Sequence, residues 1–237
     1  MQPLGHDRFK LASFSVQLGW HTEGLTFPKL EALFARRLAP TLPVIRHLSP
    51  PEVAGDTMQC ATENRVLTVE LAAHRAGWRW LARSPEEPVM PITALAQQAA
   101  QLLAELAGQC RARVGRIGIA VERLAAHPSP VLALGYHLLA PALAGELTQP
   151  SGMALEVSER IGVAGRAASA VTRIGSVLRR TAAGDSAILL AQELSSLEEE
   201  QGAAQLSAIH LSEFAIAAAA QVERALIALF PLHGERA

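Results

Sequence analysis

The chain has 237 residues, of which 50% are hydrophobic and 18% are charged, and its 21 Lys and Arg nearly balance 22 Asp and Glu. This composition excludes a disordered chain, and one that coats nucleic acid through a large net positive charge. We expect a folded protein with a sizeable core. Because Met1 to Lys10 form no apolar block, we expect no signal peptide, no membrane partner and a cytoplasmic location.

The first predicted elements are a strand, a helix and a second strand. Apolar and polar residues alternate from Phe9 to Trp20, which is typical of a half-buried strand. A helix is predicted from Thr26 to Pro40, because a proline in the first turn and a proline at the end both fit helix boundaries. A short strand over Val44–Leu48 and a loop over Ser49–Asp56 are predicted to follow.

A β-hairpin is predicted next, with strands over Arg65–Ala73 and Gly77–Arg83. Trp78 and Trp80 lie two residues apart in the second strand and therefore share one strand face. We predict that these tryptophans pack in a core beneath a helix or contribute to a protein interface. A stacking platform for a base or a sugar is the alternative.

An amphipathic helix is predicted after the hairpin, with Thr93 as its candidate N-cap. Its apolar residues recur at intervals of three and four positions as far as Cys110. A strand over Arg113–Leu124 is predicted next, from the alternation of its apolar residues. The first half is therefore predicted to run strand, helix, three strands, helix, strand.

The second half is predicted to contain a short helix over Val131–Leu143, a strand over Gly152–Val163, and a hairpin of Ala170–Arg180 with Ser186–Ser195. A long helix is predicted from about Ala203 to Phe230. This helix carries an apolar stripe. Within the stripe, we predict a protein interface at Leu211, Phe214 and Ala218.

These elements together predict an α+β fold. We expect two mainly antiparallel sheet units, ferredoxin-like or related halves, with a long C-terminal helix. The halves are predicted at residues 1–125 and 126–237, packed as one globular unit.

Standard catalytic and metal-binding motifs are absent from the sequence. It contains no P-loop, no His-Glu-x-x-His, no Cys-x-x-Cys and no Gly-x-Ser-x-Gly. Cys60 and Cys110 are its two cysteines, too few for a disulfide scaffold. We therefore predict no cofactor and no metal site, and we assign no catalytic residue. Among the dispersed histidines, His21 and His47 form the pair that we would consider first for acid–base chemistry.

Arginines concentrate in the predicted second-half strands. If they share one sheet face, they would form a basic stripe for the phosphates of RNA or DNA. If glutamates lie opposite them, they form cross-strand ion pairs instead, which is the interpretation that we favour. The five arginines are Arg160, Arg166, Arg173, Arg179 and Arg180.

Four stretches give the chain a layout that resembles a sporadically distributed, uncharacterised family of bacterial α+β proteins. They are Phe14–Leu18, Val66–Trp80, Arg116–Val121 and Ile188–Phe230. That family has an opening strand, a hairpin followed by a helix, a central strand of the Arg-Ile-Gly-Ile-x-Val kind, and a closing hairpin with a long helix. The resemblance implies an accessory protein of mobile or defence gene neighbourhoods and supplies no catalytic residues.

The leading hypothesis from the sequence is a non-enzymatic module of the bacterial cytoplasm with a regulatory or accessory role. Its sheet or terminal helix would bind another protein or a second copy of the chain. One alternative is an RNA- or DNA-contacting subunit of a ribonucleoprotein or defence complex that uses the arginine cluster. The other is a histidine-dependent nuclease or hydrolase.

Overall fold

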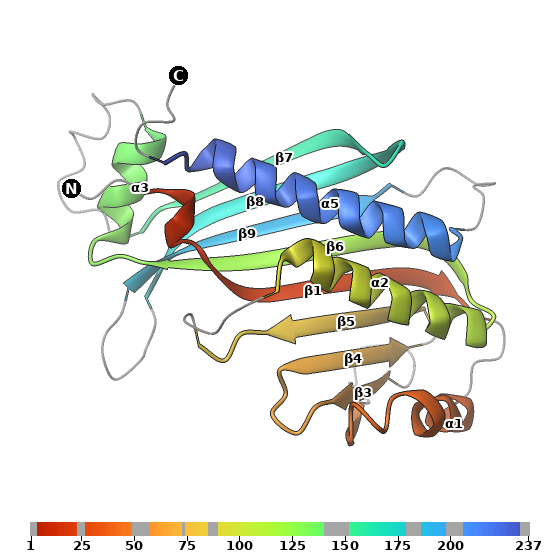
Figure 1. The fold of residues 1–237 in the computed structure, drawn as a ribbon. Helices are drawn as coiled ribbons and strands as arrows, with labels where there is room; N and C mark the ends of the chain where they lie inside the picture. The colour runs from red at the N-terminus through yellow and green to blue at the C-terminus, as the bar shows by residue number, and fades with distance from the viewer. Residues whose placement is uncertain are drawn as a thin grey trace.

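The computed structural model describes residues 4–22, 27–48, 57–72, 74–84, 90–139, 152–178, 186–197 and 206–232. Its strands form one sheet in the order β2-β3-β4-β5-β1-β6-β9-β8-β7, and every neighbouring pair is antiparallel (Figure 1). The elements in chain order are η1 (His6–Arg8), β1 (Lys10–His21), α1 (Phe27–Arg37), β2 (Val44–Leu48), β3 (Thr57–Ala61), β4 (Leu67–Ala72), β5 (Arg75–Leu81), α2 (Ile92–Gln109), β6 (Arg113–Ala126), α3 (Pro130–Leu138), β7 (Ala154–Val163), β8 (Arg166–Leu178), β9 (Ser186–Ser196) and α5 (Ala208–Leu229).

The α+β class, the antiparallel pairing and the long C-terminal helix are confirmed. The prediction of two sheet units needs correction, because β1 and β6 pair along almost their whole length and join all nine strands into one sheet. Both strands bury their alternate apolar residues on the same side, so their pairing makes one continuous core. The ferredoxin-like character of the halves and the boundary at residues 125 and 126 stay predictions.

The chain passes twice through a similar order of elements. The first pass runs from β1 through α1 and the strands β2 to β5, and ends in α2. The second runs from β6 through α3 and the strands β7 to β9, and ends in α5. In each pass the last strand returns to pair with the first, and the two first strands pair with each other at the centre of the sheet.

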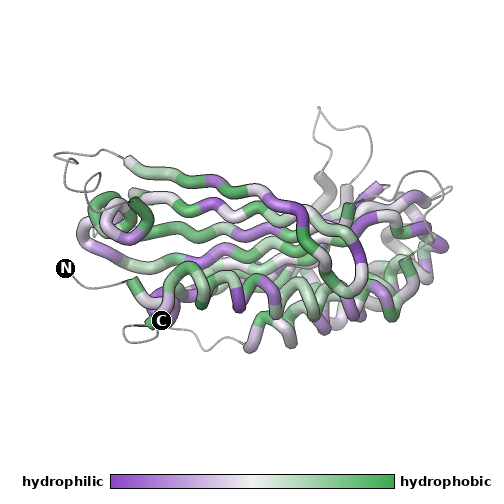
Figure 2. The backbone as a smooth tube through the Cα atoms, turned by 90° about the horizontal axis from the view of Figure 1, so that it is seen from above, coloured by the Kyte–Doolittle hydropathy of each residue, from purple (hydrophilic) through white to green (hydrophobic). Residues whose placement is uncertain are grey.

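The two long helices cover one face of the sheet, which we call the helix face. Figure 1 shows α2 and α5 side by side across the central strands, and Figure 2 shows both along one side of the sheet. α2 buries Leu103 and Leu106 completely, and α5 buries Phe214, Ala218 and Ala219 completely. The alternate apolar residues of β1 and β6 pack against these helices and complete the main hydrophobic core.

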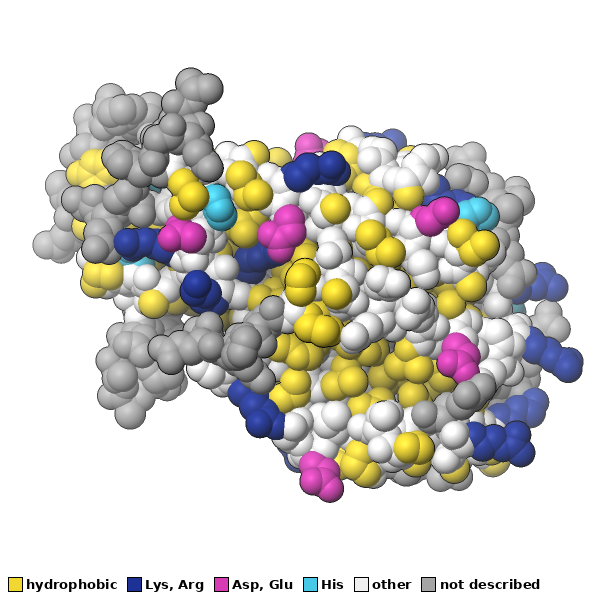
Figure 3. Space-filling model, viewed as in Figure 1, with side chains coloured by type: hydrophobic (Ala, Val, Ile, Leu, Met, Phe, Trp, Pro, Cys, Tyr) yellow, Lys and Arg dark blue, Asp and Glu magenta, His cyan; other side chains and the backbone are white. Residues whose placement is uncertain are grey.

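The margin of this core is visible on the helix side of the molecule. Hydrophobic side chains gather there beside α2, over β4 and β5 (Figure 3). Leu67 of β4 and Trp80 of β5 are partly buried members of the same core, whereas Trp78 is 4% exposed. The first half is therefore less completely covered than the centre of the sheet.

A second, smaller core anchors the end of α5. The rings of Phe9 and Phe230 lie with centroids 4.4 Å apart, and the ring of His137 stacks on Phe230 at 4.8 Å. The backbone N–H of His6 donates to the carbonyl of Phe230 at 2.7 Å. Contacts from η1 and α3 thus hold the C-terminal end of the long helix against the sheet.

Both predicted hairpins are confirmed, as β4 with β5 and as β8 with β9. The sequence predicts no strand over Thr57–Ala61, where β3 pairs with both β2 and β4. Five residues are too few for an alternating pattern to stand out. The predicted start of the first helix at Thr26 and the predicted loop over residues 49–56 lie outside the described residues.

Two helix starts differ from their predicted positions. Thr93 is not an N-cap, because α2 already begins at Ile92. α5 begins after Ser207, whose hydroxyl accepts a hydrogen bond from the backbone N–H of His210. Within the described part of the chain, no helix is long and apolar enough to cross a membrane.

Candidate interaction surface on the open face of the sheet

The face of the sheet opposite α2 and α5, which we call the open face, carries short side chains at its centre. They come from the alternate positions of β5, β1, β6 and β9, whose other residues enter the core. Gly118 lies next to Ser195, and a Cβ added at Gly118 would lie 2.7 Å from the hydroxyl oxygen of Ser195. The floor of this surface consists of Ser15, Gly77, Gly118, Ala120, Ala191 and Ser195.

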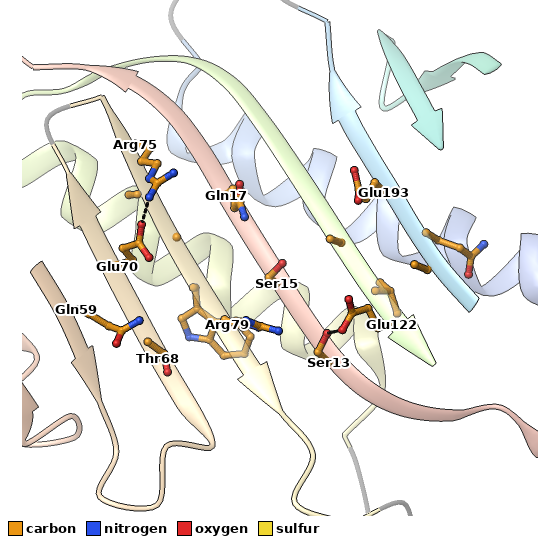
Figure 4. A pocket seen from close by; sticks show the side chains of 17 residues that line it. Ser13, Ser15, Gln17, Gln59, Thr68, Glu70, Arg75, Arg79, Glu122 and Glu193 are labelled. Atoms are coloured by element: carbon orange, nitrogen blue, oxygen red, sulfur yellow. Dashed lines mark hydrogen bonds and ion pairs between the residues drawn. The ribbon is translucent and has the colours of Figure 1, made fainter. Parts of the chain in front are cut away.

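Two adjoining hollows lie over this floor, with volumes of about 280 and 440 Å³. They share Gln17 of β1, Arg75 of β5 and Glu193 of β9. Figure 4 shows Gln17 and Ser15 along β1 between longer side chains from the flanking strands. The surface is therefore a shallow trough with a small, uncharged floor and a charged rim.

The rim carries both signs of charge in equal number. Three arginines and three glutamates line the two hollows. Arg75 forms an ion pair with Glu70 at 2.5 Å, and the hydroxyl of Ser13 donates to Glu122 at 2.7 Å. The six charged residues are Glu70, Arg75, Arg79, Arg116, Glu122 and Glu193.

Arg173 of β8 extends this pattern toward the edge of the sheet. Its guanidinium contacts Glu156 of β7 at 2.6 Å and Glu193 of β9 at 2.7 Å. The hydrogen bonds to Glu156 and Glu193 hold the pKa of Arg173 above its ordinary value. This arginine therefore serves two cross-strand ion pairs, as favoured from the sequence for this cluster.

The other predicted arginines do not gather around Arg173. Arg160 lies on the open face, because it occupies the same strand parity as Glu156. Arg166 has the opposite parity, next to the buried Val163, at the turn between β7 and β8. Arg179 and Arg180 lie outside the described residues.

The residues predicted as a protein interface lie mostly in the core. Leu211, Phe214 and Ala218 are at most 1% exposed beneath α5, so they hold the helix on the sheet. Trp78 packs against Phe14 with ring centroids 6.1 Å apart. The structure thus places these side chains in the interior, and of the two tryptophans Trp80 alone is partly accessible.

A buried ionic group lies between the sheet and α5. The side chain of Arg123 is 3% exposed, and its guanidinium donates to Gln192 at 3.2 Å and to Glu223 at 2.6 Å. Burial lowers the pKa of Arg123, whereas the charge and hydrogen bond of Glu223 act in the opposite direction. Sequence reasoning missed this group, because its partners are distant in the chain and no local pattern marks them.

Two described histidines and one cysteine lie among structural contacts. The ring of His137 bonds to the carbonyl of Leu229, and that of His127 accepts from the N–H of Ser129. Burial raises the pKa of Cys60 to about 12, which keeps this thiol protonated and unreactive. The side chain of His47 is not among those described, so its predicted pairing with His21 stays a prediction. Across the described ranges, no group of three or more His, Cys, Asp or Glu residues could hold a metal ion.

Comparison with known proteins gives no family. No protein-family model matches the sequence, and no curated protein does. Among solved structures, the chain is similar to "Methanococcus jannaschii TBP", with 12% identity over 93% of this chain and 96% of that chain. The TM-score is 0.31, so this likeness supports no conclusion about fold or function.

Proposed function

We propose that this protein is a binding module whose open face holds another polypeptide. The observation that carries the proposal is the trough at the centre of that face, with its uncharged floor and its rim of equal and opposite charges. The short side chains of the floor leave room for the side chains of a partner. The rim offers positively charged hydrogen-bond donors on its arginines and negatively charged acceptors on its glutamates. In this role the two long helices stabilise the sheet and leave its other face for binding.

The charges on the trough favour a protein over a nucleic acid as the partner. Phosphates would gain from Arg79 and Arg116 but would be repelled by the carboxylates of Glu122 and Glu193 in the same hollows. A polypeptide surface carries both signs and can match this alternation. We therefore place RNA or DNA binding second, as an outcome that the experiment below distinguishes.

The proposed role in the cell is accessory or regulatory. Defence association and a bacterial setting are proposed from the sequence resemblance. A histidine-dependent reaction has less support, because the histidine rings with described hydrogen bonds lie among structural contacts.

A photo-crosslinking residue placed at Gln17 tests the proposal in cells of the native host. Gln17 is exposed at the centre of the trough, so its replacement leaves the core intact. The matched control carries the same residue at Arg224, which is exposed on α5. We expect discrete polypeptide adducts from the Gln17 position and none of the same size from Arg224.

The nature of the adducts decides between partner classes. Adducts that are sensitive to nuclease and resistant to protease would overturn the proposal in favour of nucleic acid. Equal adducts from both positions, or none from Gln17 in a variant that melts like the wild type, would show that the open face binds no polypeptide.

A further inference from the structure

The strand β7 forms one edge of the sheet and pairs only with β8 among the described residues. Its ten residues pair with β8 in an unbroken register, without a bulge or a proline. All of them except Ile161 and Val163 are exposed. Edges of this kind present a row of unpaired backbone N–H and C=O groups that can pair with another strand.

Apolar side chains along β7 make this edge unusual. Leu155 is 41% exposed and Val157 is 49% exposed, both on the side of the sheet that α5 covers further in. An edge strand that stays unpaired usually carries charges or a proline at such positions. Two exposed apolar side chains beside unpaired backbone groups make β7 suited to pairing with a further strand.

The charges of β7 are complementary to a second copy of the same strand. In an antiparallel pair centred on Ser158, Glu156 lies opposite Arg160 of the second copy, and this contact occurs twice by symmetry. The same register places Leu155 opposite Ile161 of the second copy, also twice. In each pair, both side chains lie on the same face of the combined sheet, as they must, because residues directly opposite each other in an antiparallel ladder point the same way.

Neighbouring registers lack this complementarity. A shift by one residue in one direction places Glu156 opposite Glu159 of the second copy, and a shift by two residues in the other places Glu159 opposite itself. Opposed like charges destabilise a strand pair. Of the registers within two residues of Ser158, only the centred one pairs opposite charges.

We propose that two copies of this chain associate through β7, antiparallel about a two-fold axis at Ser158, to form one sheet that continues across both copies. Arg160 has no ion pair among the described residues, and Glu156 bonds to Arg173 through one carboxylate oxygen, which leaves the other for the second copy. The open faces of the two copies then lie on the same side. The association does not depend on what those faces bind.

A charge-swap experiment on the full-length chain tests this dimer. R160E and E156R each place like charges opposite each other in a self-pair, so each variant alone should associate at least tenfold more weakly than the wild type. An equimolar mixture of the two variants restores opposite charges at both contacts and should recover association. Sedimentation velocity over a concentration series measures the dimer fraction, and R224E on α5 is the control that should change nothing.

A disulfide measurement tests the register independently. In a C110S background, S158C should form an intermolecular disulfide under mild oxidation, because the two-fold axis brings its Cβ atoms together. E213C, on the exposed side of α5, is the control and should not crosslink at comparable rates. A wild-type protein that stays monomeric over the concentration series, or a mixture of R160E and E156R that fails to recover association, would overturn the proposal.

Discussion

The helix face and the open face of the sheet are built from alternate residues of the same strands, yet they have opposite characters. On the helix face, β1 places Phe14, Val16 and Leu18 in a core where each is at most 1% exposed. On the open face, the same strand places Ser15 and Gln17 in a trough. The contrast shows that the helix face buries the core, whereas the open face stays accessible, which is why we propose the open face as the binding surface.

The largest effect on stability should come from shortening a buried side chain on the helix face. Phe214→Ala removes a completely buried ring between α5 and the sheet and should lower the free energy of unfolding by about 3–5 kcal/mol. Gln17→Ala, on the open face, should leave that free energy unchanged within error. Urea unfolding followed by circular dichroism measures both variants. Similar losses in the two would mean that the faces do not differ as described.

An intermediate effect is expected at the buried ionic group, which lies on the helix face. Glu223→Ala leaves the guanidinium of Arg123 buried without its carboxylate and should cost about 2 kcal/mol, a value lowered because Glu223 is 41% exposed. Arg123→Met removes the charge itself and should cost less, within about 1.5 kcal/mol.

The order of these two variants is the informative result. Urea unfolding of both under the same conditions gives it directly. A loss in Arg123→Met that exceeds the loss in Glu223→Ala would show that the ion pair itself, instead of the penalty for an unpaired buried charge, dominates at this position.

The smallest effect should come from the ion pairs of the open face. Arg173→Ala breaks the contacts with Glu156 and Glu193, but all three side chains are about half exposed, so water replaces the lost interactions. We expect no measurable change in melting temperature by differential scanning calorimetry. A clear destabilisation would show that the ion pairs of the open face stabilise the fold, and it would weaken the proposal that this face is a binding surface.

Local periodicity predicted much of the fold. The alternation in β1, the two hairpins and the three- and four-residue spacing in α2 and α5 are each visible within a short window of sequence. β3 escaped prediction because its five residues give too short a pattern. The sequence could not show which strands pair across the chain, because β1 and β6 are about 100 residues apart and no local signal encodes that contact.

The candidate surface was less predictable than the fold. The most visible patterns of the sequence are an aromatic pair, apolar stripes and an arginine-rich segment. They indicated residues that the structure divides between the core and the two faces of the sheet. The trough instead depends on Ser15, Gly118 and Ser195, which are ordinary as isolated residues. They form a floor only because three strands bring them together.

The near balance of 21 basic and 22 acidic residues is a property of the sequence by itself, which also predicted the class of fold and, to within a few residues, the two long helices. Tertiary structure decided how that balance is arranged. Strand register places Arg173 between Glu156 and Glu193, and the packing of α5 buries Arg123 against Glu223. Charge partners are set by which strands become neighbours, and that choice depends on burying the whole core at once.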